Sequence, residues 1–592
     1  MAYEYAFVHL TYTIPLAGVL TVLLKPLLTR LDVYKILLLC LIAFLSALPW
    51  DSYLVRHGIW TYHPDAILGP RLFAVPAEEV FFFFIQTYIT ALIYILCNKA
   101  ILHPQFLVNG RDAPCSVYRT RRLGQLVLSA AVVTGAVLLR EGGGGTYMGL
   151  ILVWACPILL LSLTLSGYFM IQLPTASVAI PICLPTLYLW VVDERALSRG
   201  TWVIGSKTKL GWNLWGSLAL EEAVFFLLTN VLVVFGLVAF DRAMAVLDTF
   251  PDKFPRVAGR TSPILLFRAI FADPSRYEMA RIRGIRDAVG VLRRKSRSFY
   301  LASAVFPGRL RIDLILLYSF CRVADDLVDE SRTEAEALAW IQKLTGYLDH
   351  CYGTAKKQSH LASAVASYVE NNFPTAAHST LNLLPTHRLP RKPLYELLEG
   401  FKMDLAFTRG EFPIHTEEDI RAYAHRVAST VGELCLWLIF RHTSAELRDS
   451  EKSNLIQAAI TMGHALQYVN IARDIQVDAK VGRVYLPTDW LAEAGLTPKD
   501  ICVNPGQPKV EGLRQRLLDL AFREYEASRP TMGLLPDEIR GPLVVAVESY
   551  MEIGRVLRET KGIPSTTKTK KGRATVPLLR RLWVAWKNLA IS

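Results

Sequence analysis

The chain of 592 residues has little charge: Asp, Glu, Lys and Arg make up 20% of it, while hydrophobic residues make up 52% and the mean hydropathy is +0.29. This hydropathy is unusually high for a soluble protein. The sequence also lacks zinc-finger spacing and any RNA-binding signature, so nucleic acid is the least expected partner despite a net charge of +13. An anionic membrane surface or an anionic small molecule fits the positive charge better.

Cysteine is scarce and scattered. The nine cysteines, among them Cys40, Cys97 and Cys156, often fall within apolar runs, so we expect reduced packing residues rather than disulfides or metal ligands. The first apolar segment lacks a basic start and a small-residue cleavage site, so no cleavable signal peptide is predicted. The glycines at 142–145 lack the spacing of a nucleotide-binding loop and predict a turn.

Long apolar runs are what the first part of the chain has in abundance. Most are near the length of about 20 residues that crosses a bilayer. We therefore predict an all-α protein whose N-terminal domain has about seven membrane spans, with a soluble all-helical core as the alternative. The expected spans are Tyr5–Leu24, Ile36–Trp50, Val80–Cys97, Leu123–Leu139, Thr146–Leu165, Met170–Val192 and Leu218–Phe240.

This region contains an internal repeat. WDSYLVRHGIWTY at 50–62 resembles VDERALSRGTWVI at 192–204, because an acid and a Gly-x-Trp unit recur at equal spacing; PAEEVFFFF at 76–84 then matches ALEEAVFFL at 219–227. The spans therefore group as two three-span repeats joined by one span, which places both Glu-Glu pairs at the same membrane face. The matched residues outside the Glu-Glu pairs are Asp51, Gly58 and Trp60 with Asp193, Gly200 and Trp202.

The composition suggests three parts: a membrane domain at 1–240, a linker at 241–264 and a helical domain at 265–592, in which 354–393 reads as a surface insertion. Lys and Arg gather in the loops that face the side from which the C-terminal domain continues. The positive-inside rule therefore predicts a multi-pass integral membrane protein with that domain in the cytosol, in a membrane of the endoplasmic-reticulum type. Basic residues in the loop at 193–217 weaken this assignment without reversing it.

Two acidic segments stand out in the C-terminal domain. In YSFCRVADDLVDE, Asp325 and Asp329 are four residues apart and share a helical face. In QYVNIARDIQVDAKVGRVYLP, Asn470, Asp474 and Asp478 follow the same spacing. A solvated helix face explains one such cluster equally well. Two clusters within apolar helices are harder to explain that way, because buried carboxylates need compensating cations.

Oxygen ligands without His or Cys favour Mg²⁺, or Mn²⁺, over zinc. Magnesium held by few carboxylates typically bridges to substrate phosphates, and arginines bind the remaining oxygens. Arg322 and Arg473 stand beside the acids and Arg483 follows the second cluster. Two acid-rich helices around an apolar cavity therefore predict an allylic diphosphate substrate, its tail in the cavity and its head at the mouth.

This half resembles the squalene/phytoene synthase family, which has an all-helical isoprenoid-synthase fold. SRSF at 296–299 and the two acidic segments match three family motifs in order, and GFKMDL at 400–405 and YAHRVASTVG at 423–432 match two weaker ones. The residues that the resemblance implies for metal binding are Asp325, Asp329, Asn470, Asp474 and Asp478. Those implied for diphosphate binding are Arg297, Arg322, Arg473 and Arg483. Tyr318 and Tyr423 could line the cavity and stabilise cations, or be ordinary core aromatics.

The resemblance implies head-to-head condensation of two geranylgeranyl diphosphates to phytoene through a cyclopropyl intermediate, prephytoene diphosphate. GRVYLP is more similar to the phytoene branch, which ends in proton loss, than to the squalene branch, which uses NADPH. We therefore expect no NADPH. A squalene synthase-like enzyme with a multi-span membrane anchor is the alternative.

The Glu-Glu pairs open apolar spans, and an acid within a membrane is by default a functional hypothesis. Interfacial acids stabilised by the helix dipole are the alternative. Burial in hydrocarbon favours a neutral carboxylic acid, which fits a general acid. Neighbouring aromatics could shelter a carbocation or simply pack. The glutamates are Glu78, Glu79, Glu221 and Glu222; the aromatics are Phe82, Phe83, Phe225, Phe226, Trp60 and Trp202.

The repeat resembles the membrane-embedded lycopene cyclases that are heterodimers in bacteria and fused in fungi. Their signature, Pro-x-Glu-Glu, is complete at Pro76, while the second copy has Ala219. The resemblance implies protonation of a lycopene end by these glutamates, closure to a β-ring and proton loss, giving γ- or β-carotene without flavin. A transport or scaffold module is the rival interpretation. The sequence leaves open which glutamate acts, whether one or both ends are cyclised, and the oligomeric state.

The two resemblances together indicate a fungal-type bifunctional carotenoid enzyme. Its expected partners are geranylgeranyl diphosphate, lycopene, other carotene intermediates and the lipid membrane.

Overall fold

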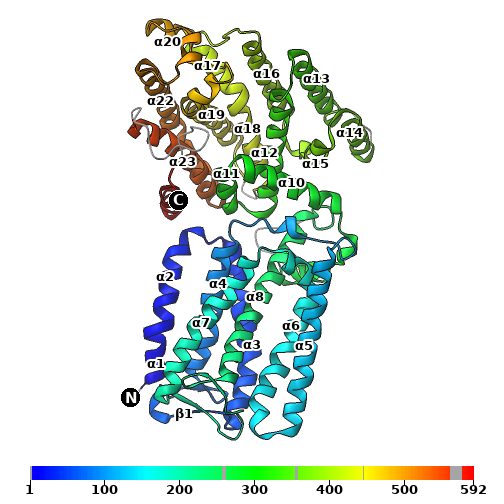
Figure 1. The fold of residues 1–592 in the computed structure, drawn as a ribbon, viewed down its shortest axis with the longest axis vertical. Coiled ribbons are helices and arrows are strands. Elements are labelled where there is room, and N and C mark those ends of the chain that lie inside the picture. Colours follow the sequence, from blue (N-terminus) through cyan, green and yellow to red (C-terminus); the bar gives the residue numbers. More distant parts are fainter. Residues whose placement is uncertain (1–2, 256–261, 354–357, 444–445, 561–575, 592) are drawn as a thin grey trace. The chain divides into compact units, whose positions relative to one another are not determined.

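The computed structural model describes residues 3–255, 262–353, 358–443, 446–560 and 576–591, and nearly all of its regular structure is helical (Figure 1). The chain divides into two compact units, Met1–Ile282 and Arg283–Ser592. The all-α prediction is confirmed.

Seven helical segments of the described residues are long and apolar enough to cross a membrane, which confirms the predicted number. The predicted span at 170–192 is misplaced, because it straddles the short turn at Leu173–Pro174 between two apolar helices. Hydropathy alone cannot separate helices joined so closely. The elements are α1 (Glu4–Val8), the π-helical turn η1 (His9–Thr13) and α2 (Ile14–Leu24), which form the first span, then α3 (Arg30–Arg56), α4 (Ala77–Asn98), α5 (Cys115–Glu141), α6 (Thr146–Gln172), α7 (Thr175–Arg199) and α8 (Leu220–Thr249).

Short strands connect the spans at the end of the unit where α4 and α8 begin. β1 and β4 pair antiparallel, so the two Gly-x-Trp loops of the repeat meet in one small sheet. Gly58 and Gly200 have positive φ values of 66° and 72°, which side chains rarely adopt. The strands are β1 (Trp60–Tyr62), β2 (Arg71–Leu72), β3 (Val75–Pro76), β4 (Trp202–Ile204), β5 (Asn213–Trp215) and β6 (Leu218–Ala219).

Close helix contacts and buried polar bonds hold the spans together. At Gly135 of α5, an added Cβ would lie 3.1 Å from the carbonyl oxygen of Gly149 in α6, so small residues permit the close approach that membrane helices need. The Gln86 amide donates to Thr229 at 2.9 Å, linking α4 to α8. The Lys35 ammonium lies 2.8 Å from Asp241, which links α3 to α8, and both residues are buried.

The first unit extends beyond the boundary expected from composition. α8 continues to Thr249 without a break at residue 240, and α9 (Pro263–Ile270) buries Leu266 and Ala269 in the same hydrophobic core. Eleven residues of the expected linker, 241–249 and 263–264, are therefore helical, and apolar side chains among the first nine continue the packed face of α8. The linker residues 256–261 lie outside the described part of the chain.

The second unit is a bundle of helices around one extended hydrophobic core. The segment 354–393, expected to be a surface insertion, is largely helical where it is described, and Val369, Ala377 and Leu381 are buried in that core. The helices are α10 (Met279–Lys295), α11 (Arg297–Ala302), α12 (Gly308–Asp329), α13 (Glu334–Cys351), α14 (Gln358–Asn372), α15 (Thr375–Leu383), α16 (Arg391–Thr408), α17 (Glu417–Ala424), α18 (Thr430–His442), α19 (Asp449–Ala479), α20 (Thr488–Glu493), α21 (Pro498–Val503), α22 (Pro508–Ser528), α23 (Asp537–Thr560) and α24 (Leu578–Ile591).

Candidate active sites

The acidic segments of the second unit lie on α12 and α19, and both helices line one cavity of about 610 Å³. Asp325 reaches it from α12, and Asp474 and Asp478 reach it from α19. Most of the wall is apolar, with side chains such as Leu314 and Met462. Acids from both helices therefore meet at one mostly apolar cavity, whereas Asp329, one turn after Asp325, is not among the residues that line it.

Arginines pair with the acids of both segments. Arg322 donates to Asp325 at 2.9 Å and also contacts Asp326. Arg473 pairs with Asp474 at 2.6 Å and contacts Asn470. Arg483, near the end of the second acidic segment, lies 2.8 Å from Asp329 on α12 and so pairs with the first segment. These pairs bring positive and negative groups together where a metal-bound diphosphate would need both.

Burial changes the acidity of the carboxyl on α12. It raises the pKa of Asp325 to about 7, with a further contribution from Asp329, and the nearby Arg322 only partly offsets these effects. A carboxylate in this position is therefore costly without more positive charge than the arginine supplies. A divalent cation would provide that charge.

A fourth acid, which the pattern of acidic clusters did not single out, lies in the same cavity wall. Asp404 of α16 is buried and accepts hydrogen bonds from Tyr485 at 2.9 Å and from Tyr423 at 3.2 Å. Burial raises its pKa to about 6, although Arg483 lowers it. Asp404 belongs to the GFKMDL segment, so the motif contained the signal although periodicity alone did not reveal it.

Three of the four remaining residues predicted for this site line the cavity, and the side chain of the fourth is not described. Tyr318 and Tyr423 both line the cavity, and Tyr423 stacks on Tyr485 with ring centroids 4.9 Å apart. Asn470 lines the cavity as well. The side chain of Arg297 lies outside the described residues.

Within the described residues, no group of three or more His, Cys, Asp or Glu is arranged to hold a metal ion by itself. Magnesium often takes one or two protein carboxylates and completes its shell with water and substrate phosphate. Asp325 and Asp474 offer carboxylate oxygens from two helices around one cavity, without nitrogen or sulfur ligands. This donor set fits Mg²⁺ bound together with a diphosphate.

In the first unit, the two members of each Glu-Glu pair differ. The first member accepts a backbone N–H from the preceding loop: Leu68 donates to Glu78 at 2.6 Å, and Leu210 donates to Glu221 at 2.5 Å. The second members, Glu79 and Glu222, line a common pocket. Position in the pair therefore separates a loop-holding glutamate from a pocket-facing one.

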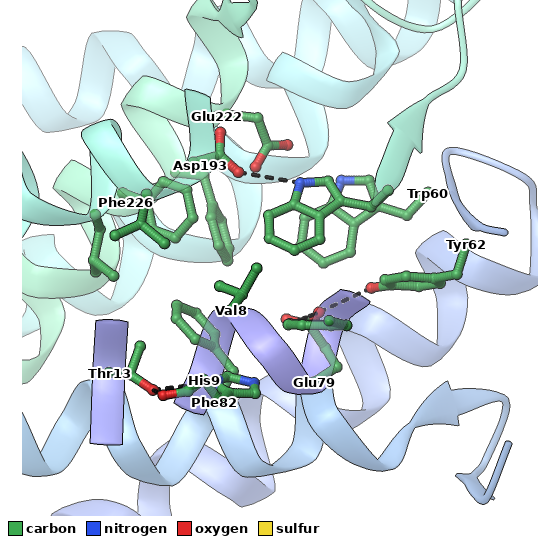
Figure 2. A pocket seen from close by; sticks show the side chains of 15 residues that line it. Val8, His9, Thr13, Trp60, Tyr62, Glu79, Phe82, Asp193, Glu222 and Phe226 are labelled. Carbon is green, nitrogen blue, oxygen red and sulfur yellow. Dashed lines mark hydrogen bonds between the residues drawn. The ribbon is translucent and has the colours of Figure 1, made fainter. Parts of the chain in front are cut away.

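Tyrosines donate hydrogen bonds to the pocket-facing carboxyls in both repeats, and Figure 2 shows the bond from Tyr62 to Glu79. Tyr5 donates to Glu79 at 2.6 Å, and Tyr147 donates to Glu222 at 2.7 Å. Glu79 accepts a second phenol, that of Tyr62, at 2.9 Å. These tyrosines come from the starts of other spans or from β1, so neighbouring sequence gave no sign of them.

Two more buried acids surround the pocket. Asp51 and Asp193, the acids of the repeat, are close enough to Glu79 and Glu222 to interact electrostatically. Trp202 donates to Asp193 at 3.1 Å, whereas neither carboxyl oxygen of Asp51 has a hydrogen-bond partner among the described residues. Four buried carboxyls therefore share one region, and none of them forms an ion pair among the described residues.

The pocket itself is narrow and mostly apolar. Its free space is about 30 Å³. Phe82, Phe225 and Phe226 form part of its wall, and Trp60 and Trp202 also line it. Phe83 is buried in the neighbouring core instead.

The loss of the signature proline does not alter the second repeat. The residue before α8, Ala219, has φ −64° and ψ 148°, and Pro76 before α4 has φ −58° and ψ 149°. Ala219 therefore supports the same entry of the chain into the helix.

Comparison with known proteins extends over both units. A family model described as squalene/phytoene synthase matches residues 292–580, and one described as lycopene cyclase matches residues 3–97. The bifunctional lycopene cyclase/phytoene synthase of Colletotrichum graminicola is 54% identical over 590 residues, covering 100% of both chains. This chain belongs to the bifunctional lycopene cyclase/phytoene synthase family. The Podospora anserina member is 51% identical over 595 residues, again covering 100% of both chains.

Proposed function

We propose that the second unit condenses two molecules of geranylgeranyl diphosphate to phytoene and that the first unit cyclises lycopene. The observation that carries the synthase assignment is that Asp325 on α12 and Asp474 and Asp478 on α19 line the same apolar cavity. A polar, acid-rich mouth on a hydrocarbon-sized hollow matches a substrate with a diphosphate head and an isoprenoid tail.

In this proposal the carboxylates hold Mg²⁺, which neutralises the diphosphate so that it can leave. The residues assigned to the metal ions are Asp325, Asp329, Asn470, Asp474 and Asp478. Arg322, Arg473 and Arg483 exchange their present carboxylate partners for diphosphate oxygens. Arg297 belongs to the same proposed set.

The cavity wall then controls the reaction of the allylic cation. The double bond of the second substrate attacks C1 of the first, a proton is lost, and a cyclopropyl diphosphate results. Departure of the second diphosphate, rearrangement and loss of another proton give phytoene, with no reductant consumed. In this proposal Tyr318 and Tyr423, which line the cavity, stabilise the cations through their rings, and apolar side chains exclude water.

The test uses the purified full-length chain with labelled geranylgeranyl diphosphate and Mg²⁺, without NADPH. Phytoene is the expected product. If no phytoene forms, or if a C40 product forms only when NADPH is added, the synthase assignment is wrong and a squalene synthase-like enzyme is favoured.

For the cyclase, we propose that Glu79 and Glu222 carry the acid–base chemistry and that Glu78 and Glu221 position the loops. One carboxylic acid adds a proton to the terminal double bond of lycopene, the chain closes on the resulting cation, and a carboxylate removes a ring proton. The proton gained equals the proton lost, so no flavin or NADPH is needed. The aromatic wall, including Phe82 and Trp60, excludes water from the cation.

The cyclase test supplies lycopene to membranes that contain the chain and measures monocyclic and bicyclic carotenes. Ring formation is expected without added flavin. If lycopene is recovered unchanged while phytoene synthesis is intact, the first unit is an anchor, transport or scaffold module instead.

We also propose that the seven apolar helices cross a membrane of the endoplasmic-reticulum type and that the synthase domain is cytosolic. α8 runs from the end with the Glu-Glu pairs to the opposite end, where the chain continues towards the second unit. Basic residues including Lys25, Arg111 and Arg119 lie in or beside the loops at that end, which supports a cytosolic assignment. Accessibility of cysteines placed in these loops to a membrane-impermeant reagent would test it.

A further inference from the structure

The two three-span repeats create two related crevices, one on each side of the central helices α4 and α8. The tyrosine bonds define the correspondence, because Tyr5 holds Glu79 as Tyr147 holds Glu222. The start of the first span therefore corresponds to the start of α6. Each crevice combines the first span of one repeat with the second span of the other: η1 and α2 with α7 on one side, and α6 with α3 on the other.

Only one crevice forms the pocket described above. Its wall from the first span consists of Tyr5, Val8, His9 and Thr13. Its wall from α7 includes Leu189 and Val192. Both Glu79 and Glu222 line this same pocket, although each comes from a different repeat.

Large aromatic side chains fill the related crevice. Trp50 of α3 stacks on Trp154 of α6, with ring centroids 4.8 Å apart and planes at 20°. A second neighbour is Phe225 of α8, whose ring is nearly parallel to that of Trp50 at 7°, with centroids 5.5 Å apart, and whose centroid lies 6.4 Å from that of Trp154. Three aromatic rings therefore occupy the space between α3, α6 and α8.

The repeat shows which substitutions produced the difference. Trp50 and Val192 precede the matched acids Asp51 and Asp193, so valine in the open crevice stands where tryptophan fills the closed one. By the tyrosine correspondence, Trp154 matches Tyr12. The closed crevice therefore has two tryptophans where the matched positions of the open crevice have valine and tyrosine.

We infer that each chain has a single cyclisation crevice, between the first span and α7, and that both pocket-facing glutamates serve it. This inference rests on the proposed cyclase function. The two Glu-Glu pairs then do not mark one site for each end of lycopene. One glutamate donates a proton and the other takes part in the same ring closure, and the second end of the substrate must enter the same crevice later.

His9 in the open crevice makes two hydrogen bonds that have no counterpart in the closed one. One ring nitrogen lies 3.0 Å from the Thr13 hydroxyl, and the other lies 3.1 Å from the backbone oxygen of Glu78. The matching residue on the other side is Ile151, which cannot make either bond. The imidazole therefore ties the first span to the start of α4 at the pocket wall.

A reciprocal exchange tests the inference in the full-length chain. Val192→Trp places the closing residue in the open crevice, and we expect ring formation to fall at least 100-fold. Trp50→Val places the open-crevice residue in the closed one, and we expect ring formation to stay within about threefold of the unsubstituted chain. The thermal midpoint of each purified variant in detergent reports whether its first unit is folded, and phytoene synthesis by the same preparations reports the amount of active chain.

The outcomes separate the inference from the proposed function. If the unsubstituted chain forms no rings, the proposed function fails. If it forms rings but Val192→Trp remains fully active, or Trp50→Val abolishes ring formation in a folded chain, the single-crevice inference is overturned. Should Trp50→Val not fold, Trp154→Tyr, which introduces the residue of the matched position, decides in its place by the same criteria.

Discussion

Replacing Glu79 by glutamine is the sharpest test of the cyclase proposal, because it removes an acidic proton with little change in shape. The carboxyl of Glu79 accepts hydrogen bonds from Tyr5 at 2.6 Å and from Tyr62 at 2.9 Å. A glutamine oxygen can accept the same bonds, so the pocket should keep its form. The amide cannot act as a general acid at neutral pH, however.

The expected loss follows from the usual contribution of a positioned acid. General acid–base catalysis contributes about 10²- to 10⁴-fold, which is about 3–5 kcal/mol of the barrier. We therefore expect Glu79→Gln, and likewise Glu222→Gln, to lower the initial rate of ring formation by at least 100-fold. The assay is chromatographic separation of lycopene from monocyclic and bicyclic carotenes over a time course.

The matched control is Glu78→Gln, one residue earlier. Its side-chain oxygen can still accept the N–H of Leu68, which Glu78 now binds at 2.6 Å, so ring formation should stay within about threefold. Phytoene synthesis should be unchanged in all three variants. Equal losses in Glu78→Gln and Glu79→Gln, or full activity of Glu79→Gln, would refute the separation into loop-holding and pocket-facing glutamates.

Three further perturbations follow from the structure. Asp474→Asn should lower phytoene synthesis at least 100-fold and leave cyclisation intact, and retained synthesis in a product assay would disprove the metal assignment. Burial and Asp329 raise the pKa of Asp325 to about 7, so below pH 7 Mg²⁺ must displace a proton from this carboxyl. The Mg²⁺ concentration for half-maximal phytoene synthesis should therefore be about tenfold higher at pH 6 than at pH 8. Equal Mg²⁺ requirements at the two pH values would contradict this assignment. Lys35→Met removes the ammonium that lies 2.8 Å from the buried carboxyl of Asp241, and we expect it to destabilise the first unit by about 3 kcal/mol. The thermal midpoint in detergent should fall, and the double variant Lys35→Met/Asp241→Asn should partly restore it. An unchanged midpoint would indicate that the pair contributes little to stability.

Periodicity was sufficient to predict the acid-bearing faces of the second unit. The i, i+4 spacing of Asp325 and Asp329 places them on one face of any helix, and both residues lie on the single helix α12. The meeting of α12 with α19 around one cavity depended on the resemblance to a known family, since nothing local specifies which helices pack together. Asp404 was missed because no other acid lies three or four residues from it on α16, and because its partners Tyr423 and Tyr485 lie 19 and 81 residues away.

The first unit shows the same limit more clearly. The repeat located both Glu-Glu pairs, but adjacent residues on a helix point about 100° apart, and only packing decides which one faces a pocket. The deciding partners are distant, since Tyr5 and Glu79 are 74 residues apart and Tyr147 and Glu222 are 75 apart. A sequence repeat also suggests equal halves, whereas the stack of Trp50 on Trp154 makes them unequal.

The most direct test of the synthase account measures binding of a non-hydrolysable geranylgeranyl thiodiphosphate to the purified full-length chain, with and without Mg²⁺. We predict tight binding only with Mg²⁺, and loss of the Mg²⁺-dependent part in Asp325→Asn and Asp478→Asn alike, because the two carboxylates line one cavity from opposite helices. Equal affinity with and without the metal, or unchanged binding in either variant, would contradict the account.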